Sequence, residues 1–302
     1  MKKLFSLLLV LTILFTVSCS PEKKEAEAHI QYTIFTGSGS RDISDTAKQT
    51  DVRGNTVSFA SSSTLDVRFT DIREKVENNS QASEITLTLG KQTYTLPYKY
   101  TYKTGLSSCK NSDLSKHNLT VSYESKDRPF TIAEYRVSTG ELIFFTILAQ
   151  DATGGDFTTE QAKKSAANLI DSLYGKEVAA RYTFDRVSEP SENESGYGYI
   201  YVTYRRYVCG YPTDDYIQIK FNKDGTVNAI NALKIGLFEP ILDTITPKKV
   251  QNAYDTLRQT VSDHWRFSDE NIQLVIAADG KCYVRVYAIS DSYSDKFYIN
   301  VT

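Results

Sequence analysis

Apolar residues recur every three or four positions between Thr158 and Gly175, which is the period of one face of an α-helix. Thr158 and Gln161 have the spacing of a capping box, in which the threonine hydroxyl accepts from a helix amide and the glutamine side chain returns to the cap. Gly175 supplies the left-handed residue that commonly ends a helix. The pattern predicts a helix from Thr159 to Tyr174 whose buried face carries Ala162, Ala166, Leu169, Ile170 and Leu173.

The same pattern returns at Thr246, which lies 88 residues after Thr158. Proline at the first helical position lacks only an amide that would be unpaired anyway, so Pro247 favours a second helix, from Pro247 to Ser262. Alternating apolar and polar residues follow each helix and indicate β-strands. Because a helix and its strands both recur, we expect an α+β protein with tandem units, each packing one helix on an antiparallel sheet, behind a β-rich N-terminal region.

Strand patterns dominate residues 30–150. Apolar residues alternate on both sides of Gly90-Lys91, as in a β-hairpin, and Asp71 to Asn78 is the one short helix candidate there. With the helical repeat, this gives a signal peptide, a tether, a β-rich domain and two helix-plus-sheet units. We assign these five parts to residues 1–18, 19–29, 30–150, 151–240 and 241–302.

The N-terminus has the organisation of a bacterial secretion signal. Lys2 and Lys3 precede an apolar run that is too short for an ordinary membrane span. Thr16-Val17-Ser18-Cys19 resembles the lipobox of bacterial lipoproteins, in which the cysteine is lipidated and becomes the first residue of the mature chain. We therefore expect an exported protein that is anchored through lipid at Cys19 to the cell membrane or the outer membrane.

Charge and cysteine usage exclude some partners. The chain has 35 basic and 37 acidic residues, and cleavage before Cys19 removes two of the lysines. A slightly acidic chain without clusters of Lys and Arg is not expected to bind nucleic acid. Cys109, Cys209 and Cys282 are too widely spaced to indicate a disulfide framework or a zinc site. We expect buried thiols, with a Cys209–Cys282 disulfide as the alternative.

The stretch from Arg205 to Ile219, followed by Lys223-Asp224-Gly225-Thr226-Val227, resembles the PepSY family and its tandem relatives in YcdB/YcdC-type bacterial surface proteins. The resemblance covers residues 150–302 and consists of a helix face, strands and a turn. It implies a non-catalytic module of exported proteins with a proposed role in regulating extracytoplasmic peptidases. It transfers no functional residue to this chain.

No arrangement typical of catalysis is visible. His29, His117 and His264 lack the spacing of a metal site or a catalytic triad. Asp214 and Asp215 are adjacent carboxylates, but neighbouring strand residues point to opposite faces, so we interpret them as part of a solvated loop. We expect a protein that is not an enzyme and that holds no metal or cofactor. A surface hydrolase that uses these carboxylates is the alternative.

Tyrosine is the one residue in excess, with 21 copies against a single Trp. Tyr199, Tyr201, Arg205 and Tyr207 share one strand parity and would project together. The residues that alternate with them are more apolar and are assigned to the helix-facing side: Ile200, Val202, Tyr204 and Val208. Because Tyr and Arg are typical of recognition surfaces, we predict that the first set binds a partner, such as a peptidase or another envelope protein, in a non-enzymatic binding or regulatory module. A glycan- or cell-wall-binding surface is the second alternative.

Overall fold

The computed structural model describes residues 30–37, 50–67, 74–77, 80–109, 111–148, 152–192, 194–261, 265–290 and 294–301. Residues Gln31–Thr302 form one compact unit. The predicted signal peptide, the tether and Cys19 lie outside the described residues, as do His29 and His264. None of the described helices is both long and apolar enough to cross a membrane.

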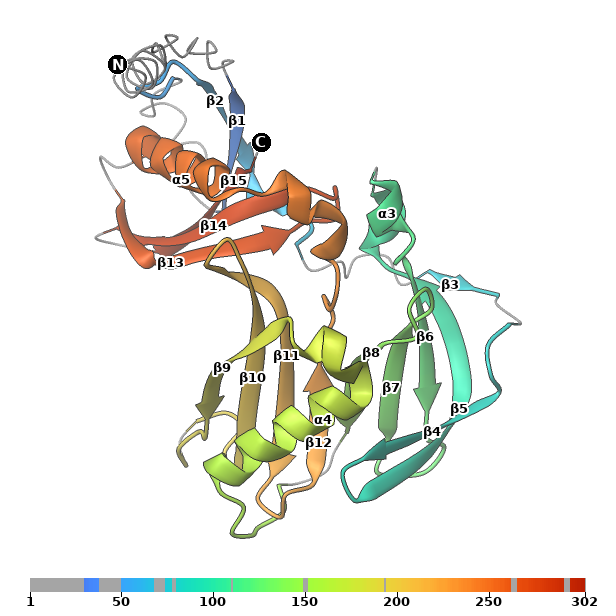
Figure 1. The fold of residues 1–302 in the computed structure, drawn as a ribbon. Coiled ribbons are helices and arrows are strands. Elements are labelled where there is room, and N and C mark those ends of the chain that lie inside the picture. The colour runs from blue at the N-terminus through green and yellow to red at the C-terminus, as the bar shows by residue number, and fades with distance from the viewer. Residues whose placement is uncertain are drawn as a thin grey trace, which may run out of the picture. The chain divides into compact units, whose positions relative to one another are not determined.

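Strands outnumber helices throughout this unit (Figure 1). The helical elements are η1 (Ser62–Thr64), η2 (Gly105–Ser108), α3 (Ser112–Ser115), α4 (Thr159–Ala179), η3 (Glu239–Thr244) and α5 (Pro247–Val261). The first eight strands are β1 (Gln31–Thr36), β2 (Thr56–Ser61), β3 (Lys75–Val76), β4 (Glu84–Leu89), β5 (Gln92–Lys103), β6 (Leu119–Glu124), β7 (Thr131–Arg136) and β8 (Leu142–Ile147). The others are β9 (Tyr182–Ser188), β10 (Tyr199–Val208), β11 (Tyr211–Asn222), β12 (Val227–Asn231), β13 (Arg266–Ile276), β14 (Cys282–Ile289) and β15 (Ser294–Asn300).

These strands are joined in one 15-stranded mixed sheet. Its main path runs β2-β1-β15-β14-β13-β11-β12-β8-β7-β6-β5-β3, while β10 and β9 extend from β11, and β4 pairs with β5. The β1–β2 and β11–β13 pairs are parallel, and the other pairs are antiparallel.

The expected fold of tandem helix-on-antiparallel-sheet units is therefore wrong. Main-chain pairing continues from β8 to β12 and from β11 to β13, between strands that the prediction placed in different units. The N-terminal strand β1 also pairs with β15 at the other end of the chain. Apolar periodicity predicts which side of a strand is buried, but it does not predict which strand lies beside it.

Both long helices form where the sequence predicts them. Thr158 and Gln161 make the complete capping box at the start of α4. The predicted end at Gly175 is wrong, because the chain bends there, with φ of 78°, and resumes helical geometry as far as Ala179. Glycine accepts this positive φ without the steric cost of a side chain.

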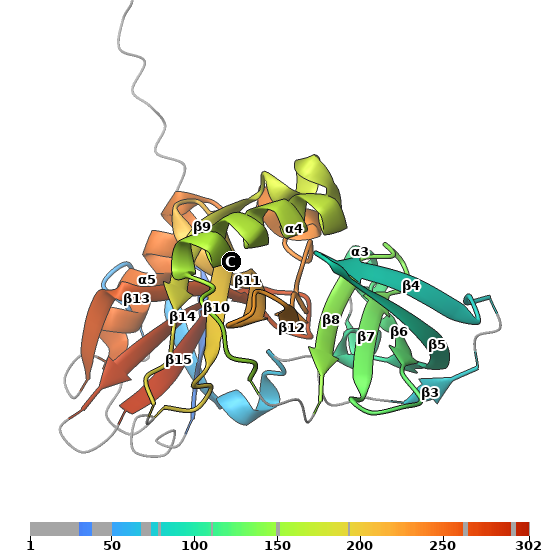
Figure 2. The same ribbon diagram turned by 90° about the horizontal axis from the view of Figure 1, so that it is seen from below.

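The apolar face of α4 covers one face of β9–β12 (Figure 2). Ala162, Ala166 and Leu169 belong to the same buried cluster as Ile200, Val202 and other residues of these strands. The cluster continues into β5–β8, where Leu96, Val121 and Phe145 are buried. Because full burial of a large apolar side chain contributes about 1.5–3 kcal/mol, this shared cluster stabilises the connection between the two regions.

The second long helix, α5, packs on β14 and β15. Its buried side chains include Val250, Tyr254 and Leu257. Trp265, at the start of the chain's return into β13, is buried with its ring centroid 5.0 Å from that of Phe297. A packed tryptophan at this position is part of the core.

The N-terminal region contains the predicted hairpin, with β4 and β5 joined through Gly90-Lys91. The helix expected within Asp71 to Asn78 is wrong for its described part, because Lys75 and Val76 pair with β5. A short helix forms instead at α3, where the Asn111 side chain accepts from two helix amides. Pairing with a long neighbouring strand satisfies the backbone more fully than an isolated turn of helix.

Candidate binding site

An irregularity in β9 turns two charged side chains toward the same opening. Thr203 of β10 pairs with Arg186, whereas the next residue, Tyr204, pairs with Phe184. Asp185 is therefore an extra residue on β9, which is the geometry of a β-bulge. Because a bulge interrupts the alternation of a strand, Asp185 and Arg186 both line one cavity.

A second irregularity lies on the other side of β10. Between Arg205 and Tyr207, β10 has one residue where β11 has three, Thr213 to Asp215. The Thr213 hydroxyl spans this widened segment, since it donates to the Arg206 carbonyl at 2.8 Å and accepts from the Asp215 amide at 3.2 Å. The segment brings Thr213 into parallel pairing with Leu274 of β13.

Side chains from β10 and β13 converge on the backbone of β11 at this junction. The carbonyl oxygen of Thr213 accepts from the guanidinium of Arg205 at 2.6 Å and from the amide of Gln273 at 2.7 Å. Gln273 in turn accepts a hydrogen bond from Arg285 of β14. A chain of polar contacts thus fixes the two arginines on either side of the β11–β13 contact.

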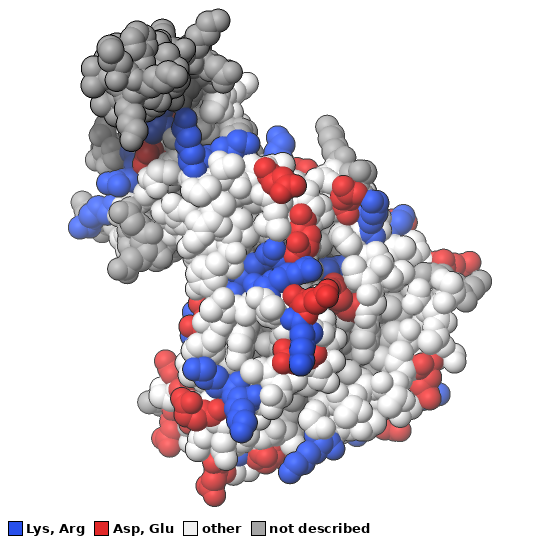
Figure 3. Space-filling view, viewed as in Figure 1, with Lys and Arg blue, Asp and Glu red and all other residues white. Residues whose placement is uncertain are grey.

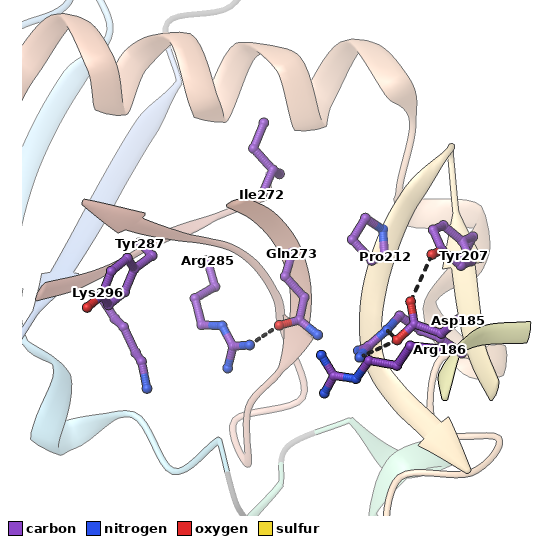
Figure 4. Close-up of a pocket in the computed structure, with 10 residues that line it drawn as sticks. Asp185, Arg186, Tyr207, Pro212, Ile272, Gln273, Arg285, Tyr287 and Lys296 are labelled. Atoms are coloured by element: carbon purple, nitrogen blue, oxygen red, sulfur yellow. Dashed lines mark hydrogen bonds and ion pairs between the residues drawn. The ribbon is translucent and has the colours of Figure 1, made fainter. Parts of the chain in front are cut away.

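A cavity of about 470 Å³ opens beside the junction (Figure 4). Its charged lining residues are Asp185, Arg186, Arg205, Arg285 and Lys296. Its uncharged lining residues are Tyr207, Pro212, Ile272, Gln273 and Tyr287. Arg186 from β9 and Arg285 from β14 extend toward one another across the opening (Figure 4).

Only part of this positive charge is neutralised within the described residues. Arg205 forms an ion pair of 3.0 Å with Asp185, which also accepts from the Tyr207 hydroxyl at 3.3 Å. Among these residues, Arg186, Arg285 and Lys296 form no ion pair with an acidic side chain. The cavity therefore has three basic side chains available to an anion.

A second cavity of about 310 Å³ shares Arg285 and Lys296 with the first. Its apolar lining includes Val67, Leu233 and Tyr298. We call the two cavities together the junction groove. Arg285 and Lys296 are common to both cavities, and each cavity also has apolar lining residues.

Several large apolar side chains are exposed at the rims of the junction groove. Tyr207 is 43% exposed, Tyr287 39% and Leu233 42%. Such residues are scattered singly on most soluble surfaces, and their collection around one concave site is typical of a binding surface.

Asp214 and Asp215 lie in β11, so their assignment to a solvated loop is wrong. The side chain of Asp214 is 12% exposed and forms an ion pair with Lys234 in the second cavity. Asp215 is fully buried on the other side of the strand and accepts a 2.8 Å hydrogen bond from Tyr182. Burial raises the pKa of Asp215 to about 7, although the Tyr182 hydrogen bond and nearby Arg206 oppose this shift.

The structure separates the four residues predicted as a binding face. Arg205 and Tyr207 line the junction groove. Tyr199 and Tyr201 lie toward the other end of β10, where the Lys220 ammonium is 3.5 Å and 6.0 Å from their ring centroids. Six residues of strand span about 20 Å, so Tyr201 and Tyr207 are too far apart to contact one small ligand.

The sequence-based prediction missed most of the residues that line the groove. These residues come from other strands or from a β-bulge. Asp185 and Arg186 depend on an interruption of pairing that apolar alternation does not reveal. Arg285, Tyr287 and Lys296 depend on the contact between β11 and β13. The available signal was the alternation of Tyr and Arg from Tyr283 to Tyr287, which repeats that of β10.

The described residues contain no group of three His, Cys, Asp or Glu side chains that could hold a metal ion. Cys209 and Cys282 are free thiols, so the alternative of a disulfide between them is wrong. Burial raises the pKa of the Cys282 thiol well above its usual range, which disfavours the reactive thiolate.

Charge is distributed differently on the face that carries α4. There, acidic and basic side chains are intermixed (Figure 3). Outside the junction groove, Glu239 forms ion pairs with both Arg181 and Arg206. Cations that already have acidic partners offer less to an anionic ligand than the basic residues of the junction groove.

No family model matches the chain, and no curated protein matches its sequence. Among solved structures, the chain is similar to the Bacillus megaterium YpeB C-terminal domain, with 10% sequence identity and a TM-score of 0.34. The alignment covers 76% of this chain and 94% of that domain.

Proposed function

We propose that this protein is an extracytoplasmic, lipid-anchored binding module without catalytic activity, and that its ligand occupies the junction groove. The observation that carries the proposal is the surplus of Arg186, Arg285 and Lys296 around one opening. Like charges held together on a rigid sheet repel one another, and an anionic ligand relieves that repulsion. Arginine also offers paired donors that match carboxylate and phosphate groups.

The acidic groups of the groove give little support to the alternative of a hydrolase. Asp185 is paired with Arg205, and Asp214 is paired with Lys234. Asp215 lies on the other side of β11 and contacts the buried Tyr182. A hydrolase of this type positions two carboxyl groups around one scissile bond, and these three are engaged elsewhere.

Glycan binding by a row of tyrosines is also less well supported. Tyr207 and Tyr287 flank basic side chains, whereas Tyr199 and Tyr201 lie outside the groove beside Lys220. The rings do not form the continuous platform on which sugars stack. A protein segment is the partner that we favour.

The remaining parts of the proposal come from the sequence. The lipobox-like Thr16-Val17-Ser18-Cys19 supports export and anchoring, and the PepSY-like stretch from Arg205 to Ile219 supports a regulatory role toward extracytoplasmic peptidases. Metabolic labelling with a fatty-acid analogue tests the anchor. Label in the wild type and none in Cys19→Ala is expected, and equal labelling would refute lipidation at this residue.

Affinity capture from envelope extracts tests the binding site. The comparison uses the wild type, a groove variant with Tyr207→Ser and Arg285→Ala, and a control variant with Tyr199→Ser and Lys220→Ala. We expect the wild type and the control to recover the same partner and the groove variant to lose it while retaining the wild-type circular dichroism spectrum. Equal recovery by all three proteins would refute the groove as the binding site.

A further inference from the structure

Arg285 and Lys296 lie on neighbouring antiparallel strands. Tyr298 pairs with Arg285 and Tyr287 pairs with Lys296, so the two basic residues are diagonal neighbours on one face of the sheet. Diagonal side chains in such a pair are about 7–8 Å apart at their origins and remain within reach of one bound group. Both residues line both cavities, so they occupy the middle of the junction groove.

Two other basic residues of the groove have acidic partners. Arg205 is neutralised by Asp185, and Lys234 by Asp214. Arg285 contacts the neutral Gln273, and within the described ranges Lys296 has no acidic partner. The strongest attraction for an anion is thus at the boundary between the cavities, with Arg186 adding to it from the first cavity.

Apolar side chains lie among the charged ones in both cavities. Pro212 and the exposed ring of Tyr287 line the first cavity, and Val67 and the exposed Leu233 line the second. Each cavity therefore offers apolar surface near the basic pair that the two cavities share. A complementary ligand carries an acidic group with an apolar group on each side.

The two side-chain amides of the groove, which could serve sugar hydroxyls, are already engaged. The side-chain amide of Gln273 is bonded to Thr213, and that of Asn231 to Tyr216. A glycan must exchange its hydration for such hydrogen bonds, whereas aliphatic side chains bury against proline, leucine and valine without them. In an extended peptide, side chains two positions apart on one face are separated by about 6.6–7 Å, which matches the spacing of neighbouring positions on the sheet.

From these features we infer that the ligand is an acidic peptide segment in extended conformation. A carboxylate binds at Arg285 and Lys296, and apolar side chains on the same face of the peptide occupy the two cavities. This inference rests on the proposed function, because it assigns the chemistry of the ligand to the same groove.

The test uses three fluorescent probes with the full mature protein. The first is a nine-residue peptide of alternating Leu and Glu on one face, separated by serines, the second replaces each Glu by Lys, and the third is an oligouronate of equal negative charge. We expect the Glu peptide to bind and the other two to bind at least about tenfold more weakly, since charge complementarity and apolar contact are both needed.

Two variants assign the binding to the predicted residues. Arg285→Ala with Lys296→Ala should weaken binding of the Glu peptide by about tenfold or more, and Leu233→Ser should weaken it while leaving weak oligouronate binding unchanged. Tyr199→Ser is the matched control and should bind as the wild type does. Stronger oligouronate binding that depends on Arg285 would overturn the peptide assignment but keep the groove as a site. Equal binding of the Glu peptide by the double variant, or no binding of it at all, would also overturn the inference, while envelope capture tests the groove independently.

Discussion

The hydroxyl of Tyr182 donates a hydrogen bond of 2.8 Å to Oδ1 of Asp215, and both side chains are buried. The other carboxylate oxygen of Asp215 has no hydrogen-bond partner among the described residues. A buried carboxylate with one oxygen unpaired is costly to ionise, which accounts for the raised pKa. Arg206 and Arg136 lower the pKa of this carboxyl, and Asp214 raises it.

This relationship predicts a pH-dependent stability. The Asp215 pKa is about 7 in the folded protein against an ordinary value of 3.8. Between these values the folded state keeps a proton that the unfolded chain has lost. The contribution of Asp215 to the free energy of unfolding therefore falls as pH rises from about 4 to 7 and is constant above that window. We expect the free energy of unfolding to fall by an amount on the order of 2–4 kcal/mol across this window.

Urea denaturation of the wild type and of Asp215→Asn at pH 5 and pH 8 measures this effect. The wild type should lose stability between the two pH values, and the variant should lose less of it, because asparagine does not ionise. Asp127→Asn on an exposed loop is the control and should follow the wild type. An identical pH dependence in wild type and Asp215→Asn would show that Asp215 is ionised in the folded state at pH 5.

Local patterns in the sequence predicted local structure well. The Thr158–Gln161 spacing predicted a capping box that forms, and the alternation in β10 placed Ile200 and Val202 in the core beneath α4. The predictions that were wrong concern features that depend on pairing between strands far apart in the sequence. The contact between β11 and β13 and the extra residue Asp185 in β9 arise from how strands meet, and a periodic pattern carries no information about either. For the same reason, only Arg205 and Tyr207 of the predicted face lie in the junction groove.

Thr213→Val tests the widened segment of β11. The Thr213 side chain is fully buried, and its hydroxyl donates to Arg206 and accepts from the Asp215 amide. Valine has nearly the same shape but leaves these backbone groups unpaired, so we expect a loss of about 1–3 kcal/mol in the free energy of unfolding.

Thr95→Val, on an exposed position of β5, is the control for Thr213→Val. It should change stability by no more than about 0.5 kcal/mol in the same denaturation experiment. If the two variants are equally stable, the Thr213 hydroxyl does not support the junction.

Substitution of Arg136 tests the hydrogen bonds that fix the segment after β12. This buried side chain donates to the carbonyls of Ile235 at 2.5 Å and Leu233 at 3.0 Å, and it forms an ion pair of 3.1 Å with Glu141. Arg136→Ala removes all three interactions and leaves Glu141 without this partner. We expect it to cost about 3–5 kcal/mol by chemical denaturation and to weaken ligand capture, because Leu233 lines the groove.

Lys126→Ala is the control variant, because it removes a basic side chain from an exposed loop. It should leave stability within about 0.5 kcal/mol of the wild type and capture unchanged. A variant at Arg136 that is as stable as the one at Lys126 would contradict the role assigned to these hydrogen bonds.

The junction groove is the proposed binding site for the partner of this protein. The most direct measurement is photo-crosslinking in intact cells, with benzoyl-phenylalanine incorporated in place of Tyr287 at the groove rim or, as the control, in place of Tyr199 outside it. We expect a discrete crosslinked product from position 287 that disappears when Arg285→Ala and Lys296→Ala are added, and none from position 199. A product from position 199 alone, or one from position 287 that survives loss of both basic side chains, would contradict it.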